Sequence, residues 1–192
     1  MSFLLNVITA WHIKPNTREK QPPPNSDAPH PAPDIVIKPP TKKIPMPRNI
    51  CRSAMSEFIM RDMVEKRGLS DRIEVASAAT SREEIGNDMY PPAKRKLDRE
   101  HIPYTRRQAR QVTKADYDKY DLLLCMEQYN IRNLKRIIPD DPDHKIHLLL
   151  DYTDNPRDIS DPWYSGDFDT AYEDIAEGCR GLLTFLSRIS SR

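Results

Sequence analysis

Five consecutive residues, Asn49-Ile50-Cys51-Arg52-Ser53, bring together groups that could bind an oxyanion. They precede a segment whose apolar residues recur at helical spacing, so we expect them to form the turn that opens a helix. Such a turn presents backbone N–H groups without intrahelical acceptors, together with the positive end of the helix dipole. Arg52 adds a planar guanidinium that can hold two oxygens of a phosphate. The alternative is a solvated arginine near an ordinary helix start.

A second cluster, Asp161-Pro162-Trp163-Tyr164, follows the last strongly apolar segment of the chain by about ten residues. Aromatic residues after an Asp-Pro pair can hold the carboxyl group stiffly beneath a hydrophobic lip. Partial desolvation suits a carboxyl group to act as a general acid. The alternative is an Asp-Pro turn without a chemical role.

Alternating strands and helices must position these two clusters. Continuous apolar runs predict strands that are buried on both faces, and strands that alternate with helices predict a parallel α/β sheet. In such sheets the site lies beyond the carboxyl ends of the strands. The expected strands are 73–77, 121–126 and 145–150, and the expected helices are 53–67, 94–101, 130–137 and 171–189.

Proline is concentrated ahead of these elements. Residues 1–50 hold 11 of the 18 prolines and none of the five glycines. Proline lacks a backbone N–H and favours polyproline II, so this composition predicts a disordered linker. We therefore divide the chain into a Pro-rich segment, 1–48, and a folded domain, 49–192.

Charge and cysteine content exclude several classes of protein. The net charge of +1 gives no electrostatic case for nucleic-acid binding, and no apolar run is long enough to span a membrane. The apolar stretch 3–11 lacks the basic start and the cleavage site of a signal peptide. Three widely spaced cysteines indicate a reducing, cytoplasmic compartment. No histidines or cysteines are spaced for a metal, and we expect no cofactor.

The order of these motifs resembles the low-molecular-weight protein tyrosine phosphatases. The resemblance covers about residues 49–186 and implies a three-layer α/β fold with a four-stranded parallel sheet flanked by helices. The matching segments are Asn49-Ile50-Cys51-Arg52-Ser53, Ala78-Ala79-Thr80, Ala109-Arg110-Gln111, Tyr120-Asp121-Leu122-Leu123-Leu124 with Met126, Arg132-Asn133-Leu134 and Asp161-Pro162-Trp163-Tyr164.

The resemblance also implies a chemical role for each motif. In that family a loop of Cys, five residues and Arg binds phosphate, and the thiolate forms a phosphocysteine. Arg52 is then the loop arginine, and Asp161 is the general acid that protonates the leaving phenolate. Ser53 would hydrogen-bond the thiolate and Asn49 would brace the loop. The implied phosphate-binding residues are Asn49, Ile50, Cys51, Arg52 and Ser53, and Trp163 and Tyr164 would wall the substrate pocket.

The chain departs from this pattern at the nucleophile. The position required by the family's spacing is occupied by Met46, whose thioether cannot ionise. Cys51 adjoins Arg52 and is no substitute. Pro47 lacks one N–H of the phosphate cradle, and Arg48 stands where the family has glycine. We therefore expect this chain to be inactive.

The family's first strand is also doubtful. Its slot reads Thr41-Lys42-Lys43-Ile44-Pro45, which cannot be a central strand because each proline deletes a donor of the ladder. Residues 35–37 are a candidate replacement. The abrupt loss of the match before Asn49 suggests a shifted reading frame. Read one base later, the codons of residues 44–48 permit Phe-Leu-Cys-His-Gly, in which the Met46 codon yields Cys.

Three functions remain open at this point. The first is a phosphotyrosine phosphatase by family, with a phosphotyrosine protein or a small aryl phosphate as substrate. The second is a pseudophosphatase that binds phosphotyrosine or another oxyanion without turnover. The third is a scaffold whose Pro-rich segment binds a partner. Arsenate reduction would need further cysteines near the site, and the sequence offers no suitable set. The oligomeric state is not predicted.

Overall fold

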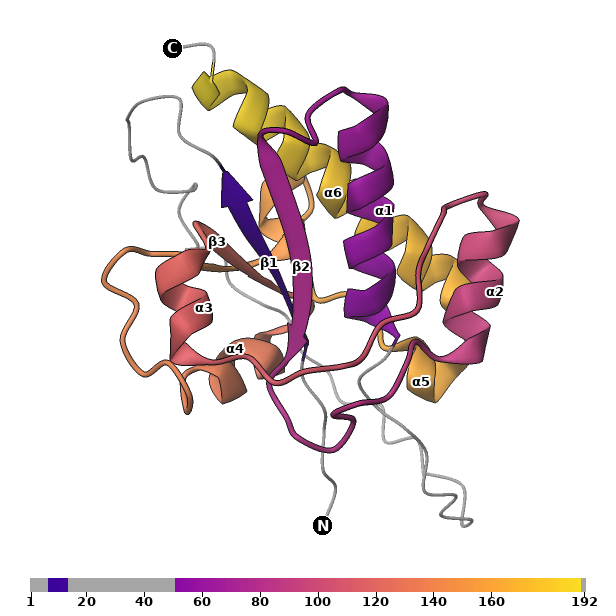
Figure 1. The fold of residues 1–192 in the computed structure, drawn as a ribbon, viewed down its shortest axis with the longest axis horizontal. Coiled ribbons are helices and arrows are strands. Elements are labelled where there is room, and N and C mark those ends of the chain that lie inside the picture. The colour runs from indigo at the N-terminus through magenta and orange to yellow at the C-terminus, as the bar shows by residue number, and fades with distance from the viewer. Residues whose placement is uncertain (1–6, 14–50, 191–192) are drawn as a thin grey trace.

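The computed structural model describes residues 7–13 and 51–190, which form a sheet between two layers of helices (Figure 1). This arrangement confirms the expected α/β fold. The strands are β1 (Val7–Ile13), β2 (Ile73–Ala79), β3 (Leu122–Cys125) and β4 (Ile146–Leu148). The helices are α1 (Arg52–Lys66), α2 (Pro91–Arg99), α3 (Lys114–Lys119), α4 (Gln128–Leu134), the short 3-10 helix η1 (Leu149–Tyr152), α5 (Pro162–Ser165) and α6 (Phe168–Ser190).

The sheet has the strand order β2-β1-β3-β4 among the described residues. β3 and β4 are parallel, whereas β1 pairs antiparallel with both of its neighbours. The expected sheet direction is therefore wrong for this one strand. Val7–Ile13 fills the slot between β2 and β3, although it lies in the segment that the sequence placed outside the domain. Residues 14–50, including 35–37 and 41–45, lie outside the described residues.

Alternate side chains of β3 point to opposite faces of the sheet, and each face is covered by its own core. Leu124 packs into the larger core, which is built from α1, α2, η1 and α6. Leu123 and Cys125 pack into the smaller core, to which α3 and α4 contribute Tyr117 and Leu134. This two-sided burial is the reason that residues 121–126 form a continuous apolar run.

The long helix α6 contains two glycines at the places where it crosses η1. A Cβ atom at Gly178 would lie 2.6 Å from Cγ of Leu149, and one at Gly181 would lie 2.2 Å from the carbonyl oxygen of Tyr152. No larger residue fits at these positions without displacing the backbone. The glycines therefore serve close packing and do not interrupt the helix.

The helix η1 overlaps the end of the segment 145–150 that was expected to be a strand, and the sequence missed two further short helices, α3 and α5. Both begin with local capping that apolar periodicity does not reveal. α3 opens with a capping box between Thr113 and Asp116, and α5 opens with Asp161 and Pro162. No helix in the described part of the chain has the length and apolarity needed to cross a bilayer.

Candidate active site

The start of α1 lies at the carboxyl-end side of the sheet and is almost fully buried. Cys51 is the N-cap residue, and its carbonyl accepts the first helical hydrogen bond, from the N–H of Met55. No side chain in the described ranges caps this end. Arg52 and Ser53 are the first helical residues, and both are buried. The first N–H groups of α1 therefore have no intrahelical acceptors, as the anion-site prediction requires.

Arg52 is held from two sides. Its side chain is only 3% exposed, and Nη1 donates to the carbonyl oxygen of Ile159. Nη2 donates to Oε1 of Glu127 at 3.1 Å and lies 3.4 Å from Oδ2 of Asp161. A buried guanidinium needs such partners because an unpaired charge is costly away from water. The arrangement fixes the plane of the guanidinium at the beginning of α1.

Asp161 is the N-cap residue of α5. Its Oδ1 accepts a hydrogen bond from the backbone N–H of Trp163 at 3.2 Å, while its Oδ2 faces Arg52. The side chain is 18% exposed, so the carboxyl group still reaches solvent. The structure thus brings together Arg52 and Asp161, which are separated by more than a hundred residues in the sequence.

The end of β3 positions both halves of this pair. The carbonyl of Met126 accepts from the N–H of Ile159, which ties the loop before Asp161 to the sheet. Oδ1 of Asn130 accepts from the N–H of Met126 at 3.0 Å, and Nδ2 of Asn130 donates to Glu127 at 2.9 Å. The sequence analysis missed Glu127. Its place directly after a buried strand was the available signal, because ligand sites gather at such ends.

The three cysteines of the chain share one kind of environment. All three are buried. Burial and the nearby carboxylate of Asp161 raise the pKa of the Cys51 thiol far above its ordinary value. Burial likewise raises the pKa of Cys125, and it raises the pKa of Cys179 to about 12. A thiol must ionise to attack phosphorus, so these environments are typical of inert structural cysteines.

The two aromatic residues after Asp161 point in different directions. The ring of Trp163 packs against Tyr90 with a centroid distance of 5.4 Å, whereas Tyr164 is 61% exposed. Trp163 lines a groove to which Arg52 and Asp161 do not contribute. The remaining predicted site residues, Asn49 and Ile50, lie outside the described part of the chain.

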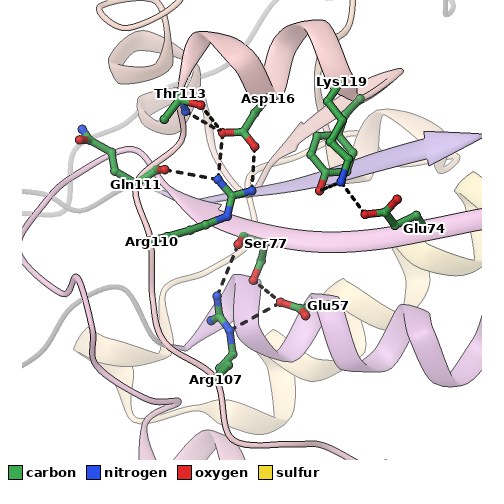
Figure 2. A network of polar contacts seen from close by, with 10 residues as sticks. Glu57, Glu74, Ser77, Arg107, Arg110, Gln111, Thr113, Asp116 and Lys119 are labelled. Carbon is green, nitrogen blue, oxygen red and sulfur yellow. Dashed lines mark hydrogen bonds and ion pairs between the residues drawn. The ribbon is translucent and has the colours of Figure 1, made fainter.

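A second arginine cluster lies where the segment 107–116 crosses the end of β2 (Figure 2). Arg110 donates two hydrogen bonds to Asp116, at 2.9 and 2.8 Å, and Thr113 donates to the same carboxylate through its N–H and its hydroxyl. These contacts outweigh the effect of burial and lower the pKa of Asp116 below its ordinary value. The cluster fixes the start of α3 to the segment before it, which pairs through its backbone with Ala79 at the end of β2.

The neighbouring Arg107 joins β2 to α1. Its Nε lies 3.6 Å from Oε2 of Glu57, and Nη2 donates to the carbonyl of Ser77 at 3.5 Å, while the Ser77 hydroxyl donates to Glu57. Burial lowers the pKa of Arg107. Because Glu57 lies one turn beyond Ser53, this network anchors the first turns of α1 to the sheet (Figure 2).

A metal site would require several ligating side chains that lie close together. Within 7–13 and 51–190, no group of three His, Cys, Asp or Glu side chains is arranged to hold a metal ion. The chemistry that this site offers comes from a buried guanidinium, a carboxyl group and a helix terminus.

Sequence comparison identifies relatives of the chain from residue 47 onward. A profile of the family described as low molecular weight phosphotyrosine protein phosphatase matches residues 47–191. The low molecular weight protein-tyrosine-phosphatase YfkJ of Bacillus subtilis is 35% identical over 142 residues, which cover 73% of this chain and 91% of the relative. The human low molecular weight phosphotyrosine protein phosphatase is 36% identical over 140 residues, covering 70% and 88%.

Solved structures agree with this assignment. The crystal structure of YfkJ from Bacillus subtilis superposes with a TM-score of 0.69 at 35% identity, covering 72% of this chain and 89% of that one. The crystal structure of Primo-1 gives a TM-score of 0.64 at 31% identity, covering 70% and 90%. By its sequence match and its fold, the chain belongs to the low molecular weight phosphotyrosine protein phosphatase family.

Proposed function

We propose that this protein binds the phosphate group of phosphotyrosine at the start of α1, in the manner of a phosphatase of its family. The observation that carries the proposal is the buried guanidinium of Arg52 beside the partly exposed carboxyl group of Asp161. The N–H groups of the first turn, which have no acceptor within the helix, and the guanidinium together suit the dianionic oxygens of a phosphate monoester. In this proposal the carboxyl group of Asp161 is the acid that delivers a proton to a leaving oxygen.

The chemical step needs a nucleophile, and we propose that the chain as written has none. Met46 occupies the position that spacing from Arg52 assigns to the attacking sulfur. A thioether has no proton to lose, so it cannot displace the phenolate from phosphorus and form a phosphocysteine. In this proposal Cys51 does not replace the nucleophile, because its thiol is buried and its pKa is raised. The protein would therefore bind the monoester without hydrolysing it.

Two features of the sequence weaken binding relative to an intact member of the family. Pro47 removes one N–H donor, and Arg48 replaces the glycine that permits close approach of the backbone to phosphate. We expect the affinity for phosphotyrosine to depend on Arg52 and on the residues around Asp161. The non-catalytic reading is thus the proposal for this polypeptide, and the catalytic reading applies to the gene if its frame is restored.

Calorimetric titration of the full chain with phosphotyrosine tests the binding proposal. Binding in the millimolar range or better is expected, together with its loss in Arg52→Ala. Absence of binding to the unaltered, folded chain would contradict the proposal. Arg136→Ala, at an exposed position after α4, is a matched control that should bind as the unaltered chain does.

Assays with p-nitrophenyl phosphate test the catalytic part. The chain as written should show no turnover, and turnover that Cys51→Ser abolishes would refute our view of Cys51. The nucleotide sequence tests the frame hypothesis, which requires an apolar strand ending in Cys-x-Gly-Asn one base out of frame. A phosphotyrosine protein or small aryl phosphate as the natural ligand and a cytoplasmic location remain predictions.

A further inference from the structure

A groove of about 770 Å³ runs along the outer side of α5, between α2 and the beginning of α6. Its floor is aromatic. The ring of Tyr90 lies 5.4 Å from that of Trp163 and 6.2 Å from that of Phe168, measured between centroids. Trp163 keeps part of its surface accessible. A floor of this kind favours an apolar side chain laid flat against the rings.

The charged side chains on the rim of the groove differ in whether they have a partner of opposite charge. Asp169, which is 65% exposed, is paired with Lys96 at 2.7 Å and with Arg99 at 3.1 Å. Asp98 accepts a weak hydrogen bond from the hydroxyl of Tyr104 at 3.3 Å. Arg95 is exposed and makes no ion pair with any residue in the described ranges. Arg95 is therefore the rim cation that can pair with a bound carboxylate, although the carboxylate of Asp98 lies on the same rim.

The groove is linked to the candidate active site by α5, although Arg52 and Asp161 do not line it. Pro162 and Trp163 line the groove, and they directly follow Asp161, whose carboxylate accepts the N–H of Trp163. α5 is only four residues long, so one side of it faces the groove and its first turn carries the acid. A peptide bound at Arg52 through its phosphate needs only a few residues of extended chain, at about 3.3–3.6 Å each, to pass this helix.

We propose that this groove binds the flank of a phosphotyrosyl peptide that carries an apolar residue next to an acidic one. The apolar residue lies on the rings of Tyr90 and Trp163, and the acidic residue pairs with Arg95. The proposal rests on the phosphotyrosine-binding function proposed above and adds a substrate class to it.

Binding of matched peptides to the full chain tests the proposal without any need for turnover. The first peptide joins phosphotyrosine to a Glu-Leu-Glu flank, the second joins it to a Gly-Ser-Gly flank, and each is also made without phosphate. Fluorescence polarisation gives the affinities. The indole N–H signal of Trp163, one of only two tryptophans, reports occupancy of the groove by NMR.

Arg95→Glu is the test variant, and Arg136→Glu is the matched control, because it reverses an exposed arginine outside the groove. We expect the acidic phosphopeptide to bind more tightly than the neutral one. Arg95→Glu should reduce this preference about two- to fivefold, as expected for an exposed ion pair, and Arg136→Glu should leave it unchanged. Equal affinities for the two phosphopeptides, or a Trp163 signal that does not move, would overturn the proposal.

The same peptides separate this proposal from the one on which it rests. If phosphate adds nothing to the affinity while the Glu-Leu-Glu flank still shifts the Trp163 signal, phosphotyrosine binding at Arg52 is refuted. Peptide binding in the groove is then still supported. If Arg52→Ala removes the contribution of phosphate while the preference for the acidic flank persists, both proposals are supported.

Discussion

Two arginine–carboxylate clusters of this protein use the same chemistry in opposite ways. Around Arg52 the cation is buried, at 3% exposure, while the facing carboxylates of Glu127 and Asp161 are 17% and 18% exposed. Around Arg110 the cation is 43% exposed, while its partner Asp116 is only 9% exposed. The first cluster presents a fixed guanidinium beside carboxylates that solvent reaches, and the second closes a carboxylate inside the fold.

The use of hydrogen-bonding capacity shows the same contrast. Asp116 accepts from both nitrogens of Arg110 and twice from Thr113, so little of its capacity is left for a ligand. Arg52 meets Asp161 at 3.4 Å, and the N–H groups that begin α1 add donors beside it. The difference is that Asp116 is saturated by its own segment, whereas Arg52 lies at a helix start whose first N–H groups have no acceptor within the helix.

The largest expected effect separates the two arginines by ligand binding. Arg52→Ala should weaken phosphotyrosine binding roughly ten- to a hundredfold, because charge-assisted hydrogen bonds are worth about 1.5–3 kcal/mol. Arg110→Ala should change the same affinity by less than about twofold. Calorimetry on both variants checks this, with Arg52→Lys as an intermediate that keeps the charge and loses the planar fork. A comparable loss in both variants would break the comparison.

The second effect concerns stability, and here the larger change is expected in the Arg110 cluster. Asp116→Ala should lower the free energy of unfolding by about 1–3 kcal/mol, since it removes the capping box of α3 and the partner of Arg110. Urea denaturation followed by circular dichroism measures the change. Asp118→Ala, at an exposed position of the same helix, is the control and should stay within about 0.5 kcal/mol. If the control is as destabilised as the test variant, the capping contacts of Asp116 contribute nothing particular.

The third prediction follows from the pKa of Asp116. Burial alone would raise this pKa, but the hydrogen bonds from Arg110 and Thr113 outweigh burial and lower it. A carboxyl group whose pKa is lower in the folded state stabilises the protein above its unfolded-state value of about 3.9. That contribution is lost as the pH falls through the folded-state pKa. The stability difference between the unaltered chain and Asp116→Asn should therefore be largest near neutral pH and shrink below about pH 4. A difference that grows on acidification would show the opposite sign of linkage.

The smallest effect is expected at Cys51, which adjoins Arg52 but takes no part in the contacts of the first cluster. Cys51→Ser should alter phosphotyrosine affinity by less than about twofold. The native chain should also react slowly with a thiol reagent, because all three of its cysteines are buried. Fast labelling of one thiol, abolished in Cys51→Ser, would place a reactive sulfur in the first cluster and change its chemistry.

Much of the fold could be predicted from the sequence because the patterns that indicate its helices and strands are local. The apolar run of β3 and the helical spacing of α1 and α6 depend on neighbours within a few residues. The motif at the start of α1 and the Asp-Pro pair pointed to Arg52 and Asp161, and the structure brings these two together. The lack of an ionisable group at Met46 is likewise a property of the sequence alone.

Other features required the folded chain. Nothing near Val7–Ile13 indicates that this strand enters the sheet between β2 and β3, or that it runs antiparallel to both. Pairing of strands that are distant in sequence depends on which slot the rest of the sheet leaves open. The short helices α3 and α5 escaped prediction because capping, and not periodicity, defines them.

By itself, then, the sequence determined the family's motifs, the main helices and buried strands, and a methionine without an ionisable group at position 46, since each is written in residue types and short spacings. Only the tertiary structure decided that Glu127 and the carbonyl of Ile159 hold Arg52. It alone showed why Gly178 and Gly181 are needed where α6 crosses η1. These facts are contacts between segments far apart in the chain, and such contacts exist only after the sheet has brought the segments to one place.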